Sequence, residues 1–468
     1  MSEHDVIVIG AGPAGEVCAG SLASEGLDVA LVERELIGGE CAFWACMPSK
    51  ALLRPAQALT EARRVPGARE AASGELSVPA VLARRDEVIH GLDDSVQLPW
   101  VTERGITLVR GAARLDGERR VRVGDDLLRA RRAVVIAVGS GAAMPPVDGL
   151  RELAPWTNRQ ATTAESPPAR LTVLGGGAVG CELAQAWATL GSRVTLVEAM
   201  PALLPGEEPF AGERLERSLR DRGIDVRTGC EASSARRDGA TGAFTIGLAD
   251  GAEVTSDELL VAVGRRPHTA DLGLESVGLP PGETIPVDER MRVLAPGTAD
   301  ETADASGGQP WLYAVGDVNG RALLTHAGKY QARVAAATIM NRPARCAWDG
   351  ALSPRVVFTE PQIAAVGRTL QQALDDGNSA RAVDADIAAT PGASFVGKGA
   401  PAAVRLVVDA QREVVLGATF CGPDVADMLH AATVAMVGEV PLRRLADAMP
   451  AFPTRSEVWL ALLSSWAP

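Results

Sequence analysis

The stretch Val6–Gly15, with the sequence VIVIGAGPAG, decides the fold that we expect for this chain. Its four β-branched residues predict a buried strand, and the glycines after it, Gly10, Gly12 and Gly15, have the spacing G-x-G-x-x-G. The first glycine permits a tight turn, the second lets a pyrophosphate approach the backbone, and the third lets the next helix pack closely on the strand. These three glycines, the first fingerprint, predict a dinucleotide with its phosphates at a helix N-terminus.

The residues that follow complete a strand–turn–helix–strand unit. We expect a helix over residues 14–26 and a second strand over residues 29–32, which Glu33 ends 18 residues past Gly15. A carboxylate at this place accepts hydrogen bonds from the ribose hydroxyls of a bound dinucleotide.

The same unit occurs a second time. A strand is expected over residues 171–174, a helix over 179–191 and another strand over 194–197. The glycines between the first strand and the helix form the second fingerprint, which comprises Gly175, Gly177 and Gly180. Two such units predict two dinucleotides bound by one chain.

Glu198 ends the second unit as Glu33 ends the first. Its carboxylate would pair with a free 2′-hydroxyl and repel a 2′-phosphate, and no arginine occurs from Ala199 to Pro205. We therefore expect NAD(H) at the second fingerprint and consider NADPH the weaker candidate.

The rest of the chain supplies further strands and a different C-terminal part. A β meander is expected over residues 106–131, and a surface loop over residues 296–310, which are rich in Pro, Gly and Asp. Further buried strands are expected over residues 134–139, 259–264 and 312–317. After about residue 350 no glycine fingerprint follows, which predicts a domain that binds no nucleotide.

Length and composition exclude several classes of protein. The chain has 468 residues, more than a single core supports. Its net charge of -13 argues against nucleic acid and against an anionic membrane surface as partners. No apolar run reaches the ~18 residues of a membrane-spanning helix. The seven cysteines are an odd number, and a polar N-terminus leads directly into a strand, so we expect a cytoplasmic protein without a disulfide framework.

A cysteine pair lies in the segment Gly38–Lys50, GGECAFWACMPSK. Cys41 and Cys46, five positions apart at the start of a helix, can form a redox-active disulfide, because a helix N-terminus and a nearby cation lower a thiol pKa. Zinc is a poorer interpretation, since a single pair lacks the further ligands of a structural site. From spacing alone, a buried and inert pair remains an equal alternative.

The whole chain resembles the pyridine nucleotide–disulfide oxidoreductases, which include dihydrolipoamide dehydrogenase, glutathione reductase and mercuric reductase. The resemblance rests on both fingerprints, the cysteine segment, and four later motifs in order: Ile136–Ser140, Val263–Pro267, Tyr313–Asp317 and Val357–Ile363. It implies an α/β fold with two Rossmann-like domains, for FAD and NAD, and an α+β C-terminal dimerisation domain. The implied boundaries are 1–150 and 272–349 for the FAD-binding and central parts, 151–271 for the NAD-binding domain, and 350–468 for the interface domain.

The resemblance also implies roles for individual residues. Cys46 would lie against the flavin, Cys41 would meet the substrate, and Lys50 would pair with Glu182. FAD would contact Gly10, Gly12, Pro13, Ala14, Gly15, Glu33, Arg34, Gly39, Lys50, Ala113, Val138, Gly139, Ser140, Asp317, Leu324, Thr325 and His326. NAD(H) would contact Gly175, Gly177, Ala178, Val179, Gly180, Glu198 and Gly264. A second copy of the chain would complete each active site in a homodimer, and no metal is implied.

One motif departs from the family. The disulfide reductases carry a C-terminal His-Pro-Thr-x-x-Glu segment whose histidine is the acid–base partner of the substrate-facing thiol. Here Phe452 replaces that histidine, while Glu457 remains as a candidate weak base or a structural residue. Three interpretations stay open: a disulfide reductase slowed roughly ten- to a hundredfold at neutral pH, an acceptor that needs no proton donor there, and another residue in the histidine's role.

The identity of the electron acceptor is therefore open. Mercury is disfavoured, because no cysteine follows Cys421 and no N-terminal Cys-x-x-Cys module is present. Phe43, Trp44 and Phe452 would suit an apolar or aromatic acceptor, although local packing of the helix is the favoured interpretation. We expect a small acceptor, a disulfide or an aromatic molecule. The alternatives are a quinone or oxygen reductase in which the flavin delivers the electrons, and a redox-responsive interaction protein of low turnover.

Overall fold

The structure is a computed structural model that describes residues 1–294 and 310–466. It divides into two units built from interleaved segments. Unit 1 comprises Met1–Pro48, Asp86–Ala142 and Arg265–Gly350, and unit 2 comprises Ser49–Arg85, Ala143–Gly264 and Ala351–Pro468. The boundaries at residues 150, 271 and 349 stay a prediction. The predicted surface loop, apart from Pro310, lies outside the described residues.

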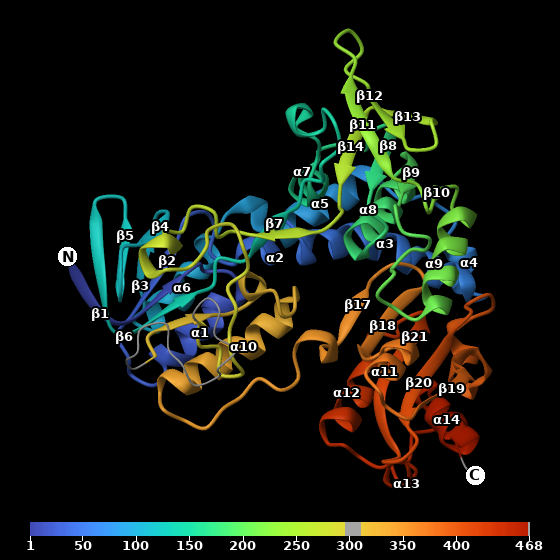
Figure 1. Ribbon diagram of the computed structural model, residues 1–468. Coiled ribbons are helices and arrows are strands. Elements are labelled where there is room, and N and C mark those ends of the chain that lie inside the picture. The colour runs from blue at the N-terminus through green and yellow to red at the C-terminus, as the bar shows by residue number, and fades with distance from the viewer. Residues whose placement is uncertain (295–309, 467–468) are drawn as a thin grey trace. The chain divides into compact units, whose positions relative to one another are not determined.

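A seven-stranded sheet forms the centre of unit 1 (Figure 1). Its order is β3-β2-β1-β6-β5-β4, with β16 also paired to β6. Parallel pairing joins β1 (Ser2–Ile9), β2 (Val29–Glu33), β3 (Thr107–Arg110), β6 (Asp126–Ile136) and β16 (Leu312–Ala314). The residues Val6–Ile9 are at most 3% exposed, because helices cover both faces of such a sheet.

The segment predicted as one meander contributes to both edges of this sheet. β4 (Ala113–Leu115) pairs antiparallel with β5 (Arg120–Val123), and β5 pairs antiparallel with the start of β6, as a meander requires. β3, however, pairs parallel with β2 at the opposite edge. The alternating pattern of its short sequence does not distinguish these two neighbours, so this part of the meander prediction was wrong.

Helices α1 (Pro13–Ala23) and α10 (Thr325–Ile339) pack against each other in unit 1 (Figure 1). Their contact is close, since a Cβ on Gly328 would lie 3.3 Å from the Cβ of Ala14 and 3.2 Å from the Cα of Gly316. This packing places the start of α10 near the first fingerprint. Unit 1 also contains a two-stranded ribbon of β7 (Ser140–Ala142) and β15 (Arg265–Pro267).

Unit 2 contains the second nucleotide-binding unit. Its parallel sheet has the order β10-β9-β8-β14 and comprises β8 (Arg170–Leu174), β9 (Arg193–Val197), β10 (Asp225–Arg227) and β14 (Glu258–Val261). Helix α8 (Ala178–Thr189) follows the second fingerprint, and α9 (Pro209–Asp221) precedes β10. An antiparallel sheet is formed by β11 (Ala232–Arg237), β12 (Phe244–Leu248) and β13 (Glu253–Ser256).

The C-terminal part of unit 2 is a five-stranded antiparallel sheet with the order β17-β18-β21-β20-β19 (Figure 1). Its strands are β17 (Arg355–Val357), β18 (Gln362–Gly367), β19 (Ala380–Asp386), β20 (Ala403–Asp409) and β21 (Val414–Gly422). Helix α12 (Leu429–Val437) packs on β18 and β21, and α14 (Val458–Trp466) packs on β19. Helices α11 (Leu370–Asp375) and α13 (Leu442–Leu445) complete this part.

The remaining helices connect these sheets. They are α2 (Gly39–Phe43), α3 (Cys46–Arg64), α4 (Ala68–Ala71), α5 (Val78–Val88), α6 (Leu98–Glu103) and α7 (Asn158–Thr163). Among the described residues, none of the helices combines the length and the apolar character that crossing a membrane requires.

Candidate active site

The first fingerprint has the backbone geometry that a phosphate-binding turn requires. Gly10 has a φ of 100°, and a Cβ there would lie 2.5 Å from the carbonyl oxygen of Ala137. A Cβ on Gly15 would overlap the carbonyl oxygen of Gly10. Gly12, in contrast, has no neighbouring heavy atom within 4 Å of a Cβ position. The turn is therefore closed on its protein side and open where a pyrophosphate approaches the start of α1.

The second fingerprint repeats this geometry in unit 2. Gly175 has a φ of 109°, and a Cβ there would overlap the carbonyl oxygen of Ala262. A Cβ on Gly180 would overlap the carbonyl oxygen of Gly175, whereas Gly177 faces open space. The residues present thus fit a dinucleotide at both turns.

The acid at the end of each second strand holds its own fingerprint turn. Glu33 accepts hydrogen bonds from the backbone N–H groups of Ala11 and Glu35, both at 2.7 Å. Glu198 accepts the corresponding bonds from Gly176 at 2.5 Å and Met200 at 2.7 Å. Both acids are at least nine-tenths buried. Two backbone hydrogen bonds per carboxylate fix the turn, a role that sequence spacing alone did not reveal.

Large apolar side chains are exposed at the second fingerprint and at two helix starts of unit 1. Val179, in the second fingerprint, and Val263, whose backbone nitrogen borders Gly175, are 43% and 44% exposed. Met47, the second residue of α3, and Leu323, two residues before α10, are 49% and 40% exposed. Exposed side chains of this size favour planar rings as ligands, because ring binding removes apolar surface from water.

A polar cluster joins the ends of three segments in unit 1. The Ser140 hydroxyl donates to Asp317 at 2.6 Å, and the Arg265 guanidinium forms an ion pair with the same carboxylate at 2.8 Å. Asp317 and Ser140 were both predicted to contact FAD. Arg265 was not predicted as the cation that pairs with Asp317, although Arg265 belongs to one of the quoted motifs.

Cys41 and Cys46 lie together in unit 1. Cys41 is in α2, and Cys46 is the first residue of α3. Both are free thiols and half-buried. The Cys46 sulfur lies 3.5 Å from the Thr325 hydroxyl, at the first residue of α10. The N-termini of two helices therefore meet this cysteine, and a helix N-terminus stabilises a thiolate.

The surroundings of Cys41 both oppose and favour its ionisation. Its hydrogen bond with Cys46 and its burial raise the pKa of the Cys41 thiol. Thr325 and the positive charge of Lys329 act in the opposite direction. Lys329 lies one turn after Thr325 on α10, and it is one of only three lysines in the chain. This lysine was not among the residues predicted to belong to the site.

Lys50 and Glu182 form an ion pair in unit 2. The two side chains are 2.7 Å apart, and Glu182 is only 5% exposed. Glu182 also accepts a hydrogen bond from the backbone N–H of Phe358 at 2.9 Å, and the Lys50 ammonium lies 4.9 Å from the centre of the Phe358 ring. The partners of the buried carboxylate are thus satisfied, as a buried charge requires. Phe358 was not predicted as a neighbour of this pair.

The other predicted cofactor residues occupy positions near these groups. Gly39 begins α2, and a Cβ there would lie 2.9 Å from Gly12. Leu324 and His326 flank Thr325 at the start of α10. Val138 and Gly139 connect β6 to Ser140. Exposed positions are occupied by Arg34 at the end of β2, by Ala178 and by Gly264, whereas Ala113 is half-buried in β4.

The C-terminal segment carries Phe452 in place of the family's catalytic histidine and retains Glu457. Phe452 is 75% exposed. Glu457 accepts a hydrogen bond from the backbone N–H of Thr454 at 3.3 Å, which forms a capping box at the start of a short 3-10 helix. Such a contact stabilises a helix start and accounts for Glu457 without an imidazole beside it. Its catalytic role stays a prediction.

Comparison with known proteins identifies the family. The model of the pyridine nucleotide-disulphide oxidoreductases matches residues 4–337, and the model of their dimerisation domain matches residues 353–462. The chain belongs to the pyridine nucleotide-disulphide oxidoreductases. It is therefore an oxidoreductase of the flavoprotein disulfide reductase type, as the sequence predicted. The family uses FAD and NAD(P)H, and the dimerisation domain supports a homodimer.

Individual relatives cover almost the whole chain. A dihydrolipoyl dehydrogenase of Thermus scotoductus is 34% identical over 98% of this chain and 96% of the relative. A mercuric reductase of Acidithiobacillus ferrooxidans is 32% identical over 97% of this chain and 81% of the relative. The Cu(II) complex of the HOCl-induced flavoprotein disulfide reductase RclA from Escherichia coli matches with a TM-score of 0.83 at 25% identity, over the full length of both chains. LpdA from Mycobacterium tuberculosis shares the fold, with a TM-score of 0.85 at 24% identity.

These comparisons confirm the predicted fold class and leave the acceptor open. Relatives with different substrates are about equally similar, so overall similarity does not select one of them. Within the described residues, no group of three or more His, Cys, Asp or Glu side chains is arranged to hold a metal ion.

Proposed function

We propose that this protein passes two electrons from NADH through FAD to the Cys41–Cys46 disulfide and from there to a small disulfide acceptor. In the overall reaction, NADH and one proton reduce the acceptor disulfide to two thiols and leave NAD⁺. The observation that carries the proposal is the hydrogen-bonded thiol pair at the meeting point of α2, α3 and α10.

The two fingerprints would bind different cofactors. When bound, FAD accepts the hydride of NADH and releases electrons to the disulfide. The first fingerprint with Pro13, Ala14 and Glu33 would hold FAD, and the Ser140–Asp317–Arg265 cluster would orient its ribityl hydroxyls. The second fingerprint with Ala178, Val179 and Glu198 would hold NAD(H). Lys50, fixed by Glu182, would supply a positive charge beside the flavin ring.

The two cysteines would have different tasks. Cys46, at the start of α3 and beside the Thr325 hydroxyl, is the thiol that the helix termini stabilise as a thiolate. Cys41 would attack the acceptor disulfide and form a mixed disulfide, and Cys46 would then displace the second thiol and restore the Cys41–Cys46 bond. Each step breaks one S–S bond and forms another, so electrons balance.

We propose that Lys329 partly compensates for the missing histidine. Its positive charge lowers the pKa of Cys41. Burial and the hydrogen bond with Cys46 nevertheless keep the pKa of the Cys41 thiol above its ordinary value. The expected result is a disulfide reductase that works best above neutral pH. Phe452→Ala and Phe452→His separate these contributions, and only the histidine variant should gain activity, about tenfold or more at pH 7.

An apolar acceptor is a second candidate, because Phe452 exposes most of its side chain where the family has a polar residue. Phe43 and Trp44, whose ring centres are 5.8 Å apart, lie between the two cysteines in sequence. A quinone or another aromatic acceptor would use such a surface and would need no proton from residue 452. In that case the flavin, not Cys41, would deliver the electrons.

The experiment that decides between these candidates is an acceptor screen on wild type and Cys41→Ser. The first proposal predicts that disulfide reduction is lost in the variant. The second predicts that quinone reduction continues at the wild-type rate. Absence of turnover with every disulfide, quinone and oxygen acceptor would contradict both and would favour a redox-responsive interaction protein.

Nucleotide preference is a separate prediction. Glu198 is buried and already fixed by two backbone N–H groups, so a 2′-phosphate would meet a carboxylate that does not move away easily. We expect a higher kcat/KM with NADH than with NADPH. A preference for NADPH would contradict this assignment without affecting the role of the cysteines.

A further inference from the structure

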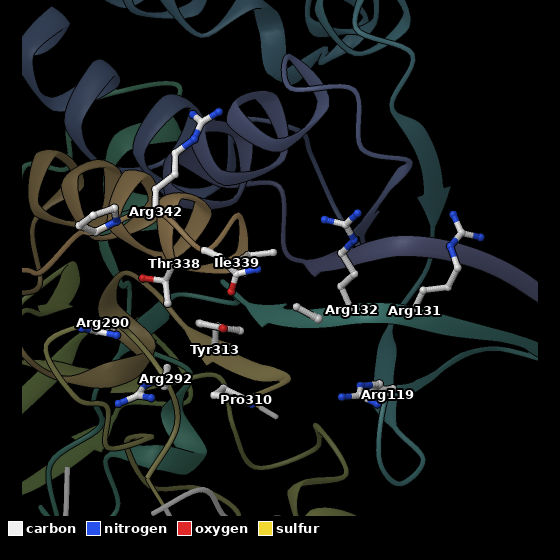
Figure 2. Close-up of a pocket in the computed structure, with 13 residues that line it drawn as sticks. Arg119, Arg131, Arg132, Arg290, Arg292, Pro310, Tyr313, Thr338, Ile339 and Arg342 are labelled. Carbon is white, nitrogen blue, oxygen red and sulfur yellow. The ribbon is translucent and has the colours of Figure 1, made fainter. Parts of the chain in front are cut away.

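A pocket of about 930 Å³ lies in unit 1 and is lined by arginines (Figure 2). Six of its thirteen lining residues are arginine, in a chain whose net charge is -13. These residues, the arginine ring, are Arg119, Arg131, Arg132, Arg290, Arg292 and Arg342. In Figure 2 they surround a centre that contains Tyr313, Thr338 and Ile339. The pocket therefore combines a cationic rim with a partly apolar floor.

The pocket is separate from the first fingerprint. Arg131 and Arg132 lie at the register shift of β6, opposite the segment between His4 and Val6 in the N-terminal half of β1, whereas the fingerprint follows the C-terminal end of β1. Arg342 and the neighbouring lining residue Ile339 lie at the C-terminal end of α10, and Thr325 begins that helix at the other end. None of the residues predicted to contact FAD or NAD lines this pocket.

Carboxylates near the arginine ring do not neutralise it completely. Arg342 pairs with Glu25, Arg292 with Asp288, and Arg131 with Asp5 and Asp28. Two members of the ring have weaker ion pairs, Arg132 with Asp5 at 3.9 Å and Arg119 with Glu118 at 3.4 Å.

Arg290 is the exposed member of the ring for which the described residues supply no carboxylate partner. Five guanidinium groups of the ring therefore pair with five carboxylates, and the charge of Arg290 is not balanced by a carboxylate of the described residues.

Arg119 occupies an unfavourable backbone conformation. Its φ is 56°, in the left-handed region that a glycine would adopt without strain. Its Nε is buried and has no hydrogen-bond partner. An arginine at such a position costs stability in two ways, through backbone strain and through an unsatisfied buried donor. Because Nε is buried, only the terminal nitrogens of this guanidinium could contact a ligand in the pocket.

We propose that the arginine ring binds a polyphosphate, either inorganic or carried by a nucleotide whose ring lies on the Tyr313 floor. Arginine forks match phosphate oxygens, and several guanidinium groups around one pocket suit several linked phosphates better than a single anion. None of the residues of the proposed redox path lines this pocket.

The test is isothermal titration of the FAD-loaded protein with inorganic triphosphate, and in a parallel arm with adenosine triphosphate, in saturating NAD⁺. NAD⁺ occupies the second fingerprint and leaves the arginine ring as the remaining anion site. We expect binding that weakens steeply as salt concentration rises. Tighter binding of adenosine triphosphate than of inorganic triphosphate would show that the pocket also binds the nucleoside. Equal binding would show that it recognises only the phosphates. Citrate at the same charge should bind at least tenfold more weakly.

Arg119→Gly separates binding from folding. The variant should bind triphosphate at least tenfold more weakly, while its Tm stays the same or rises because the backbone strain is removed. Arg290→Gln, at an exposed position, should weaken binding as well. The control Arg151→Ala/Arg443→Ala removes two exposed arginines elsewhere and should leave affinity unchanged. Absence of binding at low salt, displacement of the ligand by NAD⁺, or an equal loss in the control would overturn the proposal.

Discussion

The two fingerprints have nearly the same backbone and different chemistry. In each, the first glycine has a φ near 100°, the third packs on the first, and a buried acid accepts two backbone hydrogen bonds. The residues that follow the third glycine differ. Glu16 follows Gly15 in unit 1, whereas Cys181 and then Glu182 follow Gly180 in unit 2. The glycines thus fix where a dinucleotide lies, and the neighbouring side chains determine what reacts beside it.

The largest expected difference between the two regions is the dithiol, which follows only the first fingerprint. Cys41→Ser and Cys46→Ser should each reduce disulfide turnover at least about a thousandfold, because one thiolate attacks and the other completes the exchange. Cys18→Ala, in the first fingerprint helix, is the matched control and should retain turnover. Steady-state rates with a disulfide acceptor measure both, and a fully active Cys41→Ser variant would disprove the proposed path.

Substitution of the middle glycines should separate the two cofactors. A methyl group at Gly12 or Gly177 meets no protein atom within 4 Å, so each variant should fold. It would instead occupy the space of a pyrophosphate and weaken binding about a hundredfold, or ~3 kcal/mol. Gly12→Ala should lose FAD, while Gly177→Ala should keep FAD and raise the KM for NADH. Flavin absorbance and NADH kinetics measure these effects. Loss of FAD from Gly177→Ala and a raised KM for NADH in Gly12→Ala would show that the two cofactor sites are exchanged.

Glu16, the residue after the third glycine of the first fingerprint, should make the stability of the folded protein depend on pH. Burial raises the pKa of Glu16 from 4.5 to about 7, against the opposing charge of Lys329. The folded state therefore favours the protonated carboxyl, and stability falls as pH rises from 4.5 towards 7. Glu16→Gln should be more stable than wild type by about 3 kcal/mol at pH 8 and equal to it at pH 4.

The second unit provides the comparison for this effect. Burial raises the pKa of the Cys181 thiol, so Cys181 stays neutral over the pH range of the experiment. The stability difference between Cys181→Ala and wild type should therefore not change with pH. Urea unfolding across this pH range measures both variants. A constant difference between Glu16→Gln and wild type at all pH values would contradict the role of ionisation.

The ion pair between Lys50 and Glu182, a residue of helix α8, should have the smallest of these effects. Lys50→Met removes the partner of a carboxylate that is 5% exposed, whereas the lysine itself is 33% exposed and partly solvated. We expect a loss of about 2 kcal/mol in unfolding free energy, less than for a fully buried pair. Glu182→Gln in the Lys50→Met background should recover most of it, and a double-mutant cycle measures the coupling. Strictly additive losses would show that the pair does not act as a unit.

The elements around both fingerprints could be predicted because strand, glycines and acid are adjacent in sequence. The prediction was wrong for β3, because pairing at the two edges of a sheet depends on distant strands. The bonds of Glu33 and Glu198 to their own turns were missed, since a spacing rule identifies an acid and not its partners. Arg265, Phe358 and Lys329 were missed, because tertiary packing and not sequence spacing brings them to their sites. Phe452 was visible only as a departure from the family's motif.

The central claim is that the dithiol and a bound flavin exchange electrons in one protein. Anaerobic titration of the oxidised, FAD-loaded protein with NADH tests it directly. We expect two equivalents of NADH to be consumed per chain and two new thiols to appear, whereas Cys41→Ser should consume one equivalent and gain no thiols. Consumption of a single equivalent with no gain of thiols would contradict the account.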